Sequence, residues 1–306
     1  MIRHFITIEE LSSDDLASIL SLATSPFDDT TLSGQGVALV FERPSLRTRA
    51  SSSSAVHELG GYVTFFSDDE IGLDTRESVE DVGRTIAEMY SIAGLRVRRH
   101  DVFARMRAAT DERLSLINLM DDVAHPTQAV ADVLTIADEF AHGDAGQLAG
   151  LNVAYVGDAT NVARSLAVAL LRLGVDVTIA APIGYQLAAD GAEDPAQVAG
   201  PGTLRLVDTM DEAVKNADVI YTDTWVSMGL ESEGARRREE LADFQVNGAV
   251  MAMAKPTAIV LHCLPAHRGE EVTNGILDGA QSRVWRQVFH RRSSMIGVLR
   301  WIKGEV

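Results

Sequence analysis

Short apolar runs alternate with longer segments of helical periodicity along the first half of the chain. The runs have the length of buried strands, and the longer segments carry apolar residues at the spacing of an amphipathic helix. Residues 67–76 are polar and acidic and are predicted to form a loop. The predicted strands cover residues 37–41, 62–66 and 117–119, and the predicted helices cover 46–59, 77–90 and 127–140.

The second half repeats this alternation after a glycine-containing junction at 141–146. A strand at 152–158, a helix at 162–173 and a strand at 175–180 form a predicted βαβ unit, and further strands are predicted at 219–222 and 258–262. Strands that alternate with helices predict parallel sheets covered by helices on both faces. We therefore expect an α/β fold of two lobes, with a site in the cleft outside the carboxyl ends of the strands.

Composition narrows the class of protein. Hydrophobic residues make up 46% of the 306 residues, and no apolar run approaches the roughly 20 residues that span a bilayer. The N-terminus becomes acidic at once and lacks the apolar core of a signal peptide, which predicts a cytoplasmic protein. The formal net charge of −17 argues against nucleic-acid binding, which needs a basic face. Cys263 is the only cysteine, so an intramolecular disulfide is excluded and a cysteine-based zinc site is disfavoured.

Nearly all of the basic charge is arginine, and GC-rich coding or a high-salt habitat would each produce this pattern. One arginine cluster, FERPSLRTR, ends the strand 37–41 and opens the following helix. Free N–H groups at a helix start attract an anion, and arginine offers a fork that matches phosphate oxygens. A Ser45 helix cap beside solvated arginines explains the segment equally well locally. Three arginines around one helix start in an acidic chain favour the phosphate site.

Two further motifs are weak when taken alone. His125 and Gln128 lie three residues apart at a helix start, where they could hold a planar amide-like group, although a surface histidine with a capping threonine is commoner. Asp223 follows the strand 219–222, where a carboxylate suits an ammonium group. A helix cap at Asp223 with Trp225 in the core is an equal alternative.

Two rival classes of enzyme are disfavoured. His262 and Cys263 are adjacent at a strand end and are expected to point to opposite faces, which argues against a cysteine nucleophile paired with this histidine. The segment VGDATN after the strand 152–158 lacks the G-x-G-x-x-G pattern, which argues against a dinucleotide-binding dehydrogenase.

Each motif alone is weak, but the motifs together, in this order and at this spacing, are specific for one family. They are SLRTR, HPTQ, GDATNV, DTWVSMG and HCLPAHRGEEVT. Over almost its whole length the chain resembles the aspartate/ornithine carbamoyltransferase family, and the last two motifs resemble its ornithine branch. The resemblance implies a carbamoyl-phosphate-binding domain at 1–140, an ornithine-binding domain at 141–285 and a C-terminal helix at 286–306 that packs back on the first domain. It also implies carbamoyl transfer from carbamoyl phosphate to the δ-amino group of ornithine, giving citrulline and phosphate in arginine metabolism. The expected assembly is a homotrimer or a multiple of trimers, with no metal, no cofactor and no covalent enzyme intermediate.

The resemblance also assigns roles to individual residues. The set implied for carbamoyl phosphate is Ser45, Leu46 through its backbone, Arg47, Thr48, Arg98, His125, Gln128, Cys263, Leu264 and Arg291. The set implied for ornithine is Asn161, Asp223, Ser227 and Met228, with Asn161 facing the carboxylate and Asp223 facing the α-ammonium group. Catalytic roles are implied for Arg98, His125 and Cys263.

Several positions depart from the family pattern. Leu46 stands where ornithine enzymes usually carry threonine, and serines at 51–53 replace a usual S-F-E run. The acidic loop 67–76 is longer than expected and belongs to a region that in this family reaches a neighbouring subunit's phosphate site; Arg76 could offset its negative charge. The terminal N-R-x-H-x-x-K pattern keeps only Arg291. Two alternatives therefore stay open: a family member that uses a different amine acceptor, and a non-catalytic member.

Overall fold

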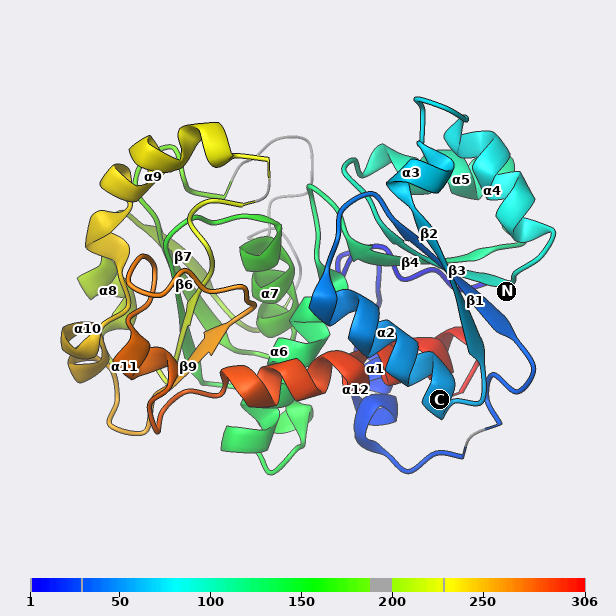
Figure 1. Cartoon of the computed structure of the whole chain (residues 1–306). Helices are drawn as coiled ribbons and strands as arrows, with labels where there is room; N and C mark the ends of the chain where they lie inside the picture. Colours follow the sequence, from blue (N-terminus) through cyan, green and yellow to red (C-terminus); the bar gives the residue numbers. More distant parts are fainter. Residues whose placement is uncertain (1, 29, 188–199, 228, 306) are drawn as a thin grey trace. The chain divides into compact units, whose positions relative to one another are not determined.

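The computed structural model of the chain describes residues 2–28, 30–187, 200–227 and 229–305. The chain forms two compact units: unit 1 comprises Met1–Ala131 and His290–Val306, and unit 2 comprises Asp132–Phe289. Both chain ends therefore belong to unit 1 (Figure 1). Each unit is built on a parallel sheet, which confirms the predicted fold class.

Unit 1 contains a four-stranded sheet in the order β2-β1-β3-β4. The strands are β1 (Gly36–Phe41), β2 (Tyr62–Ser67), β3 (Ile92–Arg96) and β4 (Ser115–Met120). Phe41 pairs with Ser67 on one side and with Arg96 on the other, so the carboxyl ends of β1, β2 and β3 meet at one edge. The sequence pattern predicts β1, β2 and β4. It does not predict β3, whose run of apolar residues is interrupted by Gly94 and Arg96.

Helices cover both faces of this sheet. They are α1 (Ser13–Thr24), α2 (Leu46–Glu58), α3 (Asp68–Ile71), α4 (Val79–Ala87), α5 (Asp101–Ala109), the start of α6 (Pro126–Phe140) and the end of α12 (Val284–Ile302). Buried residues of α3, α4 and α5, among them Val82 and Phe103, pack with Val40 and Leu95 on one face. Figure 1 shows α1, α2 and α12 on the other face.

The short helix α3 corrects the prediction that residues 67–76 form only a loop. The Glu70 carboxylate accepts hydrogen bonds from Ser67 N and Ser67 Oγ at 2.7 and 3.1 Å, which fixes the start of the turn. Ile71 is buried, and Gly72 ends the helix with a φ of +57°. One buried residue in an otherwise polar segment is too weak a periodicity to predict a helix from sequence.

Unit 2 contains a five-stranded parallel sheet in the order β7-β6-β5-β8-β9. The strands are β5 (Asn152–Val156), β6 (Asp176–Ala180), β7 (Leu204–Val207), β8 (Val219–Thr222) and β9 (Ile259–His262). The helices are α7 (Asn161–Arg172), α8 (Met210–Val214), α9 (Gly234–Glu240), α10 (Gly248–Met253), α11 (Asn274–Leu277) and the remaining parts of α6 and α12. The strand order reverses direction at β5, and such a switch point in a parallel sheet is a usual place for a ligand.

Helix α12 packs against α6 and α1 within unit 1. Ser294 Oγ donates a hydrogen bond to Thr127 O at 2.8 Å, and Trp301 Nε1 donates to Asp15 Oδ1 at 3.1 Å. This confirms the expected return of the C-terminal helix. Across the described residues, every helix is too short or too polar to cross a bilayer.

Candidate active site

The N-terminus of α2 follows directly from the carboxyl end of β1. Ser45 is the N-cap residue with extended backbone angles, and its Oγ accepts a hydrogen bond from Thr48 N at 3.3 Å. The same Oγ lies 3.0 Å from Thr48 Oγ1. The Leu46 side chain is 79% exposed, so it leaves the backbone of this turn uncovered. The predicted Ser45 helix cap is therefore confirmed. The arginines beside it are not merely solvated, because Arg49 lies over the Phe65 ring at 4.0 Å. The cap coexists with a helix start that suits an anion.

A buried cluster joins this turn to α6 and α12. Arg291 is 4% exposed; its Nη2 donates to Thr48 Oγ1 at 3.2 Å and its Nη1 donates to Gln128 Oε1. Arg291 Nη1 also lies 3.3 Å from His125 Nε2. Residues from three distant parts of the sequence thus meet within unit 1: Thr48, the pair His125 and Gln128, and Arg291.

The electrostatics of this cluster are cationic. Burial lowers the pKa of His125 well below 6.5, and the charges of Arg291, Arg96 and Arg47 lower it further. A neutral His125 ring has one N–H donor and one acceptor nitrogen. Because a guanidinium can only donate, Nε2 is the nitrogen that accepts from Arg291. Arg96 is not among the site residues predicted from the sequence. The signal that identifies it is an arginine at the carboxyl end of a buried strand.

Arg98 lies in a second group of charges, at the carboxyl edge of the unit 1 sheet. Its backbone N–H donates to Glu42 Oε2 at 2.6 Å, and its Nη2 lies 2.5 Å from Asp68 Oδ2. Two other loop charges also have partners within unit 1: Asp74 pairs with Arg105 at 2.5 Å, and Arg76 Nη1 donates to Glu70 O at 2.9 Å. The acidic segment is thus held to its own unit.

Unit 2 brings together the residues that follow β8 and β9. These strands are parallel neighbours with Thr222 opposite His262, so Asp223 and Cys263 leave the sheet side by side. Cys263 Sγ lies 2.7 Å from Asp223 Oδ1 and donates to it. Residues 223–227 contain no helix, so the helix-cap alternative for Asp223 is wrong, whereas the expected burial of Trp225 is confirmed at 3% exposure.

The partners of His262 differ from those of Cys263. His262 Nδ1 accepts a hydrogen bond from Leu264 N at 2.8 Å, which places the ring proton on Nε2. Nε2 then donates to Glu271 Oε1 at 3.1 Å, and Glu271 is fully buried. These contacts hold the backbone on either side of Cys263 and support the exclusion of a His262–Cys263 nucleophile pair.

Two more residues of the ornithine set, Asn161 and Ser227, lie at the same edge of the unit 2 sheet. Asn161 begins α7 just after β5, and Ser227 lies in the segment after β8. Met228 lies outside the described residues. Asp158, which is not among the site residues predicted from the sequence, is buried here and pairs with Arg237. Burial raises the pKa of Asp158 to about 6, against the opposing effect of Arg237, and the nearby Asp223 charge also raises it.

Among the residues that the structure describes, two groups of side chains have donor atoms close enough to hold a metal ion. They are Asp223, His262 and Cys263, and His267, Glu270 and Glu271; within each group the atoms lie within 4.8 Å of one another. In the first group, both ring nitrogens of His262 already have partners. In the second, Glu270 is paired with Arg238 at 2.9 Å, a fixed cation that disfavours a metal ion.

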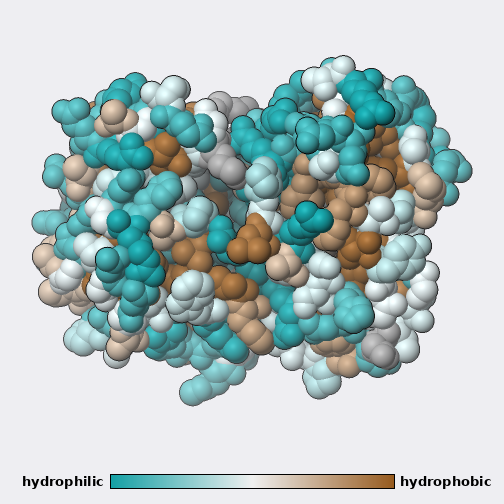
Figure 2. All heavy atoms as spheres, viewed as in Figure 1, coloured by the Kyte–Doolittle hydropathy of each residue, from teal (hydrophilic) through white to brown (hydrophobic). Residues whose placement is uncertain are grey.

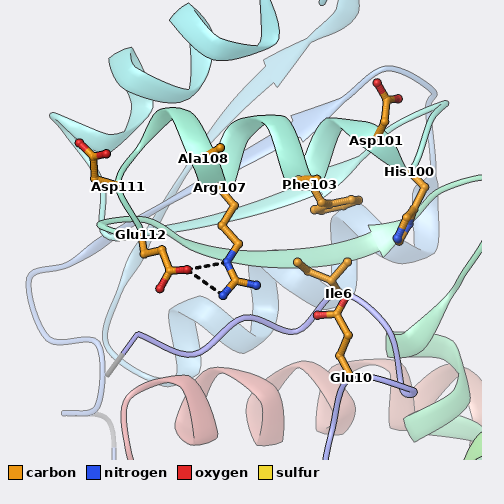
Figure 3. Close-up of a pocket in the computed structure, with 10 residues that line it drawn as sticks. Ile6, Glu10, His100, Asp101, Phe103, Arg107, Ala108, Asp111 and Glu112 are labelled. Carbon is orange, nitrogen blue, oxygen red and sulfur yellow. Dashed lines mark hydrogen bonds and ion pairs between the residues drawn. The ribbon is translucent and has the colours of Figure 1, made fainter.

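A separate cavity of about 410 Å³ opens on unit 1 between α5 and the N-terminal segment (Figure 3). Its lining combines the apolar side chains of Ile6 and Phe103 with His100 and with an ion pair between Arg107 and Glu112. The predicted site residues are not part of this lining. The candidate active site is therefore defined by contacts between polar side chains and by sheet topology.

The family models assign each part of the chain to a known domain type. Residues 3–138 match the aspartate/ornithine carbamoyltransferase carbamoyl-P binding domain, and residues 149–302 match the Asp/Orn binding domain. The chain therefore belongs to the aspartate/ornithine carbamoyltransferase family.

The similar proteins carry the name of the ornithine branch. The chain is 42% identical over 303 residues to an ornithine carbamoyltransferase of Acidothermus cellulolyticus, covering 95% of this chain and 93% of that protein. The solved ornithine carbamoyltransferase of Pyrococcus furiosus superposes with a TM-score of 0.91 at 34% identity, covering 99% of this chain and 98% of that one. An anabolic ornithine carbamoyltransferase from Campylobacter jejuni gives a TM-score of 0.90 at 30% identity, with 98% and 99% covered.

Proposed function

We propose that this protein transfers the carbamoyl group of carbamoyl phosphate to the δ-amino group of L-ornithine and releases L-citrulline and phosphate. The observation that carries the proposal is the buried cluster in which Arg291 holds Thr48, His125 and Gln128 next to the N-terminus of α2. An arginine-rich helix start suits a phosphate, and an adjacent imidazole and amide suit a planar carbamoyl group.

We assign carbamoyl phosphate to unit 1. The helix start at Ser45, Leu46 and Thr48 would bind phosphate oxygens through N–H and hydroxyl groups, and Arg47, Arg98 and Arg291 would supply charge. The Gln128 side chain has the hydrogen-bonding groups to hold the carbamoyl amide. When carbamoyl phosphate binds and displaces the contact between Arg291 and His125, the N–H of His125 would donate to the carbonyl oxygen of the substrate.

We assign ornithine to unit 2. The Asp223 carboxylate would bind the α-ammonium group, and Asn161 would bind the carboxylate of the substrate. Ser227 and Met228 would complete this set, and Cys263 and Leu264 would contact both substrates. A carboxylate at Asp223 favours an acceptor with a free α-amino group, which argues against the alternative of an N-acylated amine.

The reaction follows from holding both substrates in register. A neutral δ-amine attacks the carbamoyl carbon, a tetrahedral oxyanion forms, and its collapse expels phosphate, which takes up the amine proton. Donors placed where the oxyanion develops stabilise it, and Arg98, Thr48 and His125 would serve there. Fixing two bound reactants contributes up to roughly 7–11 kcal/mol of the barrier reduction. No covalent enzyme intermediate is needed.

A product assay tests the proposal. Carbamoyl phosphate is supplied with ornithine, putrescine, lysine and N-acetylornithine in turn, and citrulline-type products and phosphate are both measured. We expect turnover with ornithine. Turnover with a different amine alone would favour the alternative acceptor, and no turnover together with no thermal stabilisation by carbamoyl phosphate would favour the non-catalytic alternative.

We also infer a homotrimer or a multiple of trimers. Strand β2 is an open edge of the unit 1 sheet. Its residue Tyr62 is 56% exposed, and Leu46 of α2 is 79% exposed. Figure 2 shows apolar atoms over the part of unit 1 that carries this strand. Exposed apolar surface beside an open strand edge favours association. The subunit mass is 33.0 kDa, and light scattering that gives the mass of one or two subunits would contradict the assembly.

A further inference from the structure

Three charged residues meet at the carboxyl edge of the unit 1 sheet because of strand register. Phe41, Ser67 and Arg96 lie side by side at the ends of β1, β2 and β3. The residues that follow them in the chain include Glu42, Asp68 and Arg98. Topology alone therefore places two carboxylates beside Arg98, at the edge from which α2 and the proposed phosphate site begin.

The two carboxylates hold different parts of Arg98. Glu42 has a side chain that is only 8% exposed; it accepts from Arg98 N at 2.6 Å, while its Oε1 lies 3.9 Å from Arg98 Nη1. Asp68 is 35% exposed and contacts only the tip of the guanidinium, at 2.5 Å from Nη2. The Nη2 group also donates to Glu42 O at 3.4 Å. Glu42 thus positions the Arg98 backbone, and Asp68 is the carboxylate that occupies Nη2.

Asp68 is held in this place by the short helix α3. It is the first residue of the helix, and its backbone carbonyl accepts from Gly72 N at 2.7 Å. The Glu70–Ser67 contacts fix the start of α3, and buried Ile71 attaches it to the core of unit 1. The helix therefore holds the Asp68 carboxylate in position beside Arg98, and little conformational entropy is lost when the two groups pair.

We propose that the Asp68 carboxylate competes with the phosphate of the substrate for the Arg98 guanidinium and so weakens carbamoyl phosphate binding. This inference rests on the proposed function of the unit 1 site. A carboxylate and a phosphate use the same guanidinium donors. Asp68 must release Nη2 before a phosphate oxygen can take its place, and a retained Asp68 charge would repel the phosphate. Glu42 keeps its backbone contact in both states.

The test compares two isosteric variants of neighbouring residues. Asp68→Asn removes the negative charge that contacts Arg98. Asp69→Asn removes an equal negative charge one residue further along the same helix. The measurements are the dissociation constant of inorganic phosphate by calorimetry and the KM for carbamoyl phosphate. We expect Asp68→Asn to tighten both by about two- to fivefold, the range of a partly exposed ion pair. Asp69→Asn and Asp68→Glu are expected to stay close to wild type.

The outcomes separate this inference from the proposed function. If the wild-type protein turns over and Asp68→Asn leaves the phosphate affinity unchanged or weakens it, the competition is overturned and the proposed function stands. Equal tightening by Asp69→Asn would also overturn it, because the effect would then be one of general charge. A wild-type protein that binds neither phosphate nor carbamoyl phosphate would overturn both. Tightening in Asp68→Asn alone, with an unchanged melting temperature, supports the competition.

Discussion

Arg47 belongs to the first turn of α2, where three of the assigned phosphate contacts lie. Its charge acts on His125, so the guanidinium lies near the buried cluster. Replacing Arg47 with alanine should weaken carbamoyl phosphate binding about 10- to 100-fold, the effect of losing hydrogen bonds between charged groups. Calorimetry measures the affinity. Arg84→Ala, which removes an exposed arginine paired with Asp81, is the control and should bind normally.

The buried His125 predicts a pH dependence of stability. Burial and the charges of Arg291, Arg96 and Arg47 lower its pKa in the folded state well below 6.5. The unfolded chain therefore binds more protons as the pH falls below 6.5. The stability that neutral His125 contributes is present above this pH and is progressively lost below it.

Chemical unfolding of wild type and His125→Gln measures this contribution. Between about pH 7.5 and about pH 5.5, wild type should lose about 1 kcal/mol more of its free energy of unfolding than the variant. The pKa of His100 is raised, mainly by its hydrogen bond with Asp121, and acts in the opposite direction. That effect is common to both proteins and cancels. Equal losses in the two proteins would show that His125 titrates normally.

At the scale of elements, the contact between α12 and α1 depends on a glycine. A Cβ at Gly297 would lie 2.4 Å from the Ile19 carbonyl oxygen and 2.9 Å from Ala23 Cβ. Helix propensity alone favours alanine by about 1 kcal/mol. Because the nearest atom is backbone, the close contact should dominate, and Gly297→Ala should destabilise unit 1 by about 1–3 kcal/mol.

The matched control is another helical glycine with open space around it. Gly275 in α11 has no neighbouring atom within 4 Å of an added Cβ, so Gly275→Ala should be neutral or slightly stabilising. Thermal unfolding monitored by circular dichroism compares the two variants. A Gly297→Ala protein as stable as wild type would mean that α12 shifts away from α1 at little cost.

The elements that the sequence predicts are those with a strong pattern. The apolar runs of β1 and β5 and the proline start of α6 need no tertiary context. In contrast, β7 has two partly buried and two exposed residues, and α3 buries a single side chain. Their stability comes from neighbouring elements, so their local patterns do not predict them.

The same distinction applies to the candidate site. The candidate residues around Ser45, His125, Asp223 and Cys263 can be selected from the sequence because family spacing links their motifs. The side chains that contact or influence the candidate residues cannot be selected in this way. Asp68 reaches Arg98 through strand register, and Arg96 influences His125 through space. Such pairings depend on which strands are neighbours, and sheet order does not follow from a list of strands.

At the scale of the whole molecule, the two units differ in how the chain builds them. Unit 2 is one continuous segment, whereas unit 1 combines residues from both ends. An isolated 132–289 fragment should therefore show a cooperative unfolding transition. An isolated 1–131 fragment should not, because it lacks the buried side chains of Arg291, Met295 and Leu299. Circular dichroism against denaturant distinguishes the two, and cooperative unfolding of 1–131 would contradict this expectation.

The return of α12 to unit 1 has a consequence for the nascent protein on the ribosome. Domains generally fold in the order of synthesis, the first part first. Residues 1–131 cannot complete unit 1 until α12 has been synthesised, because Arg291 supplies the contacts with Thr48 and Gln128. A nascent chain that ends before α12 would thus lack the proposed anion-binding cluster. Synthesis of α12 itself becomes a condition for the proposed capture of carbamoyl phosphate.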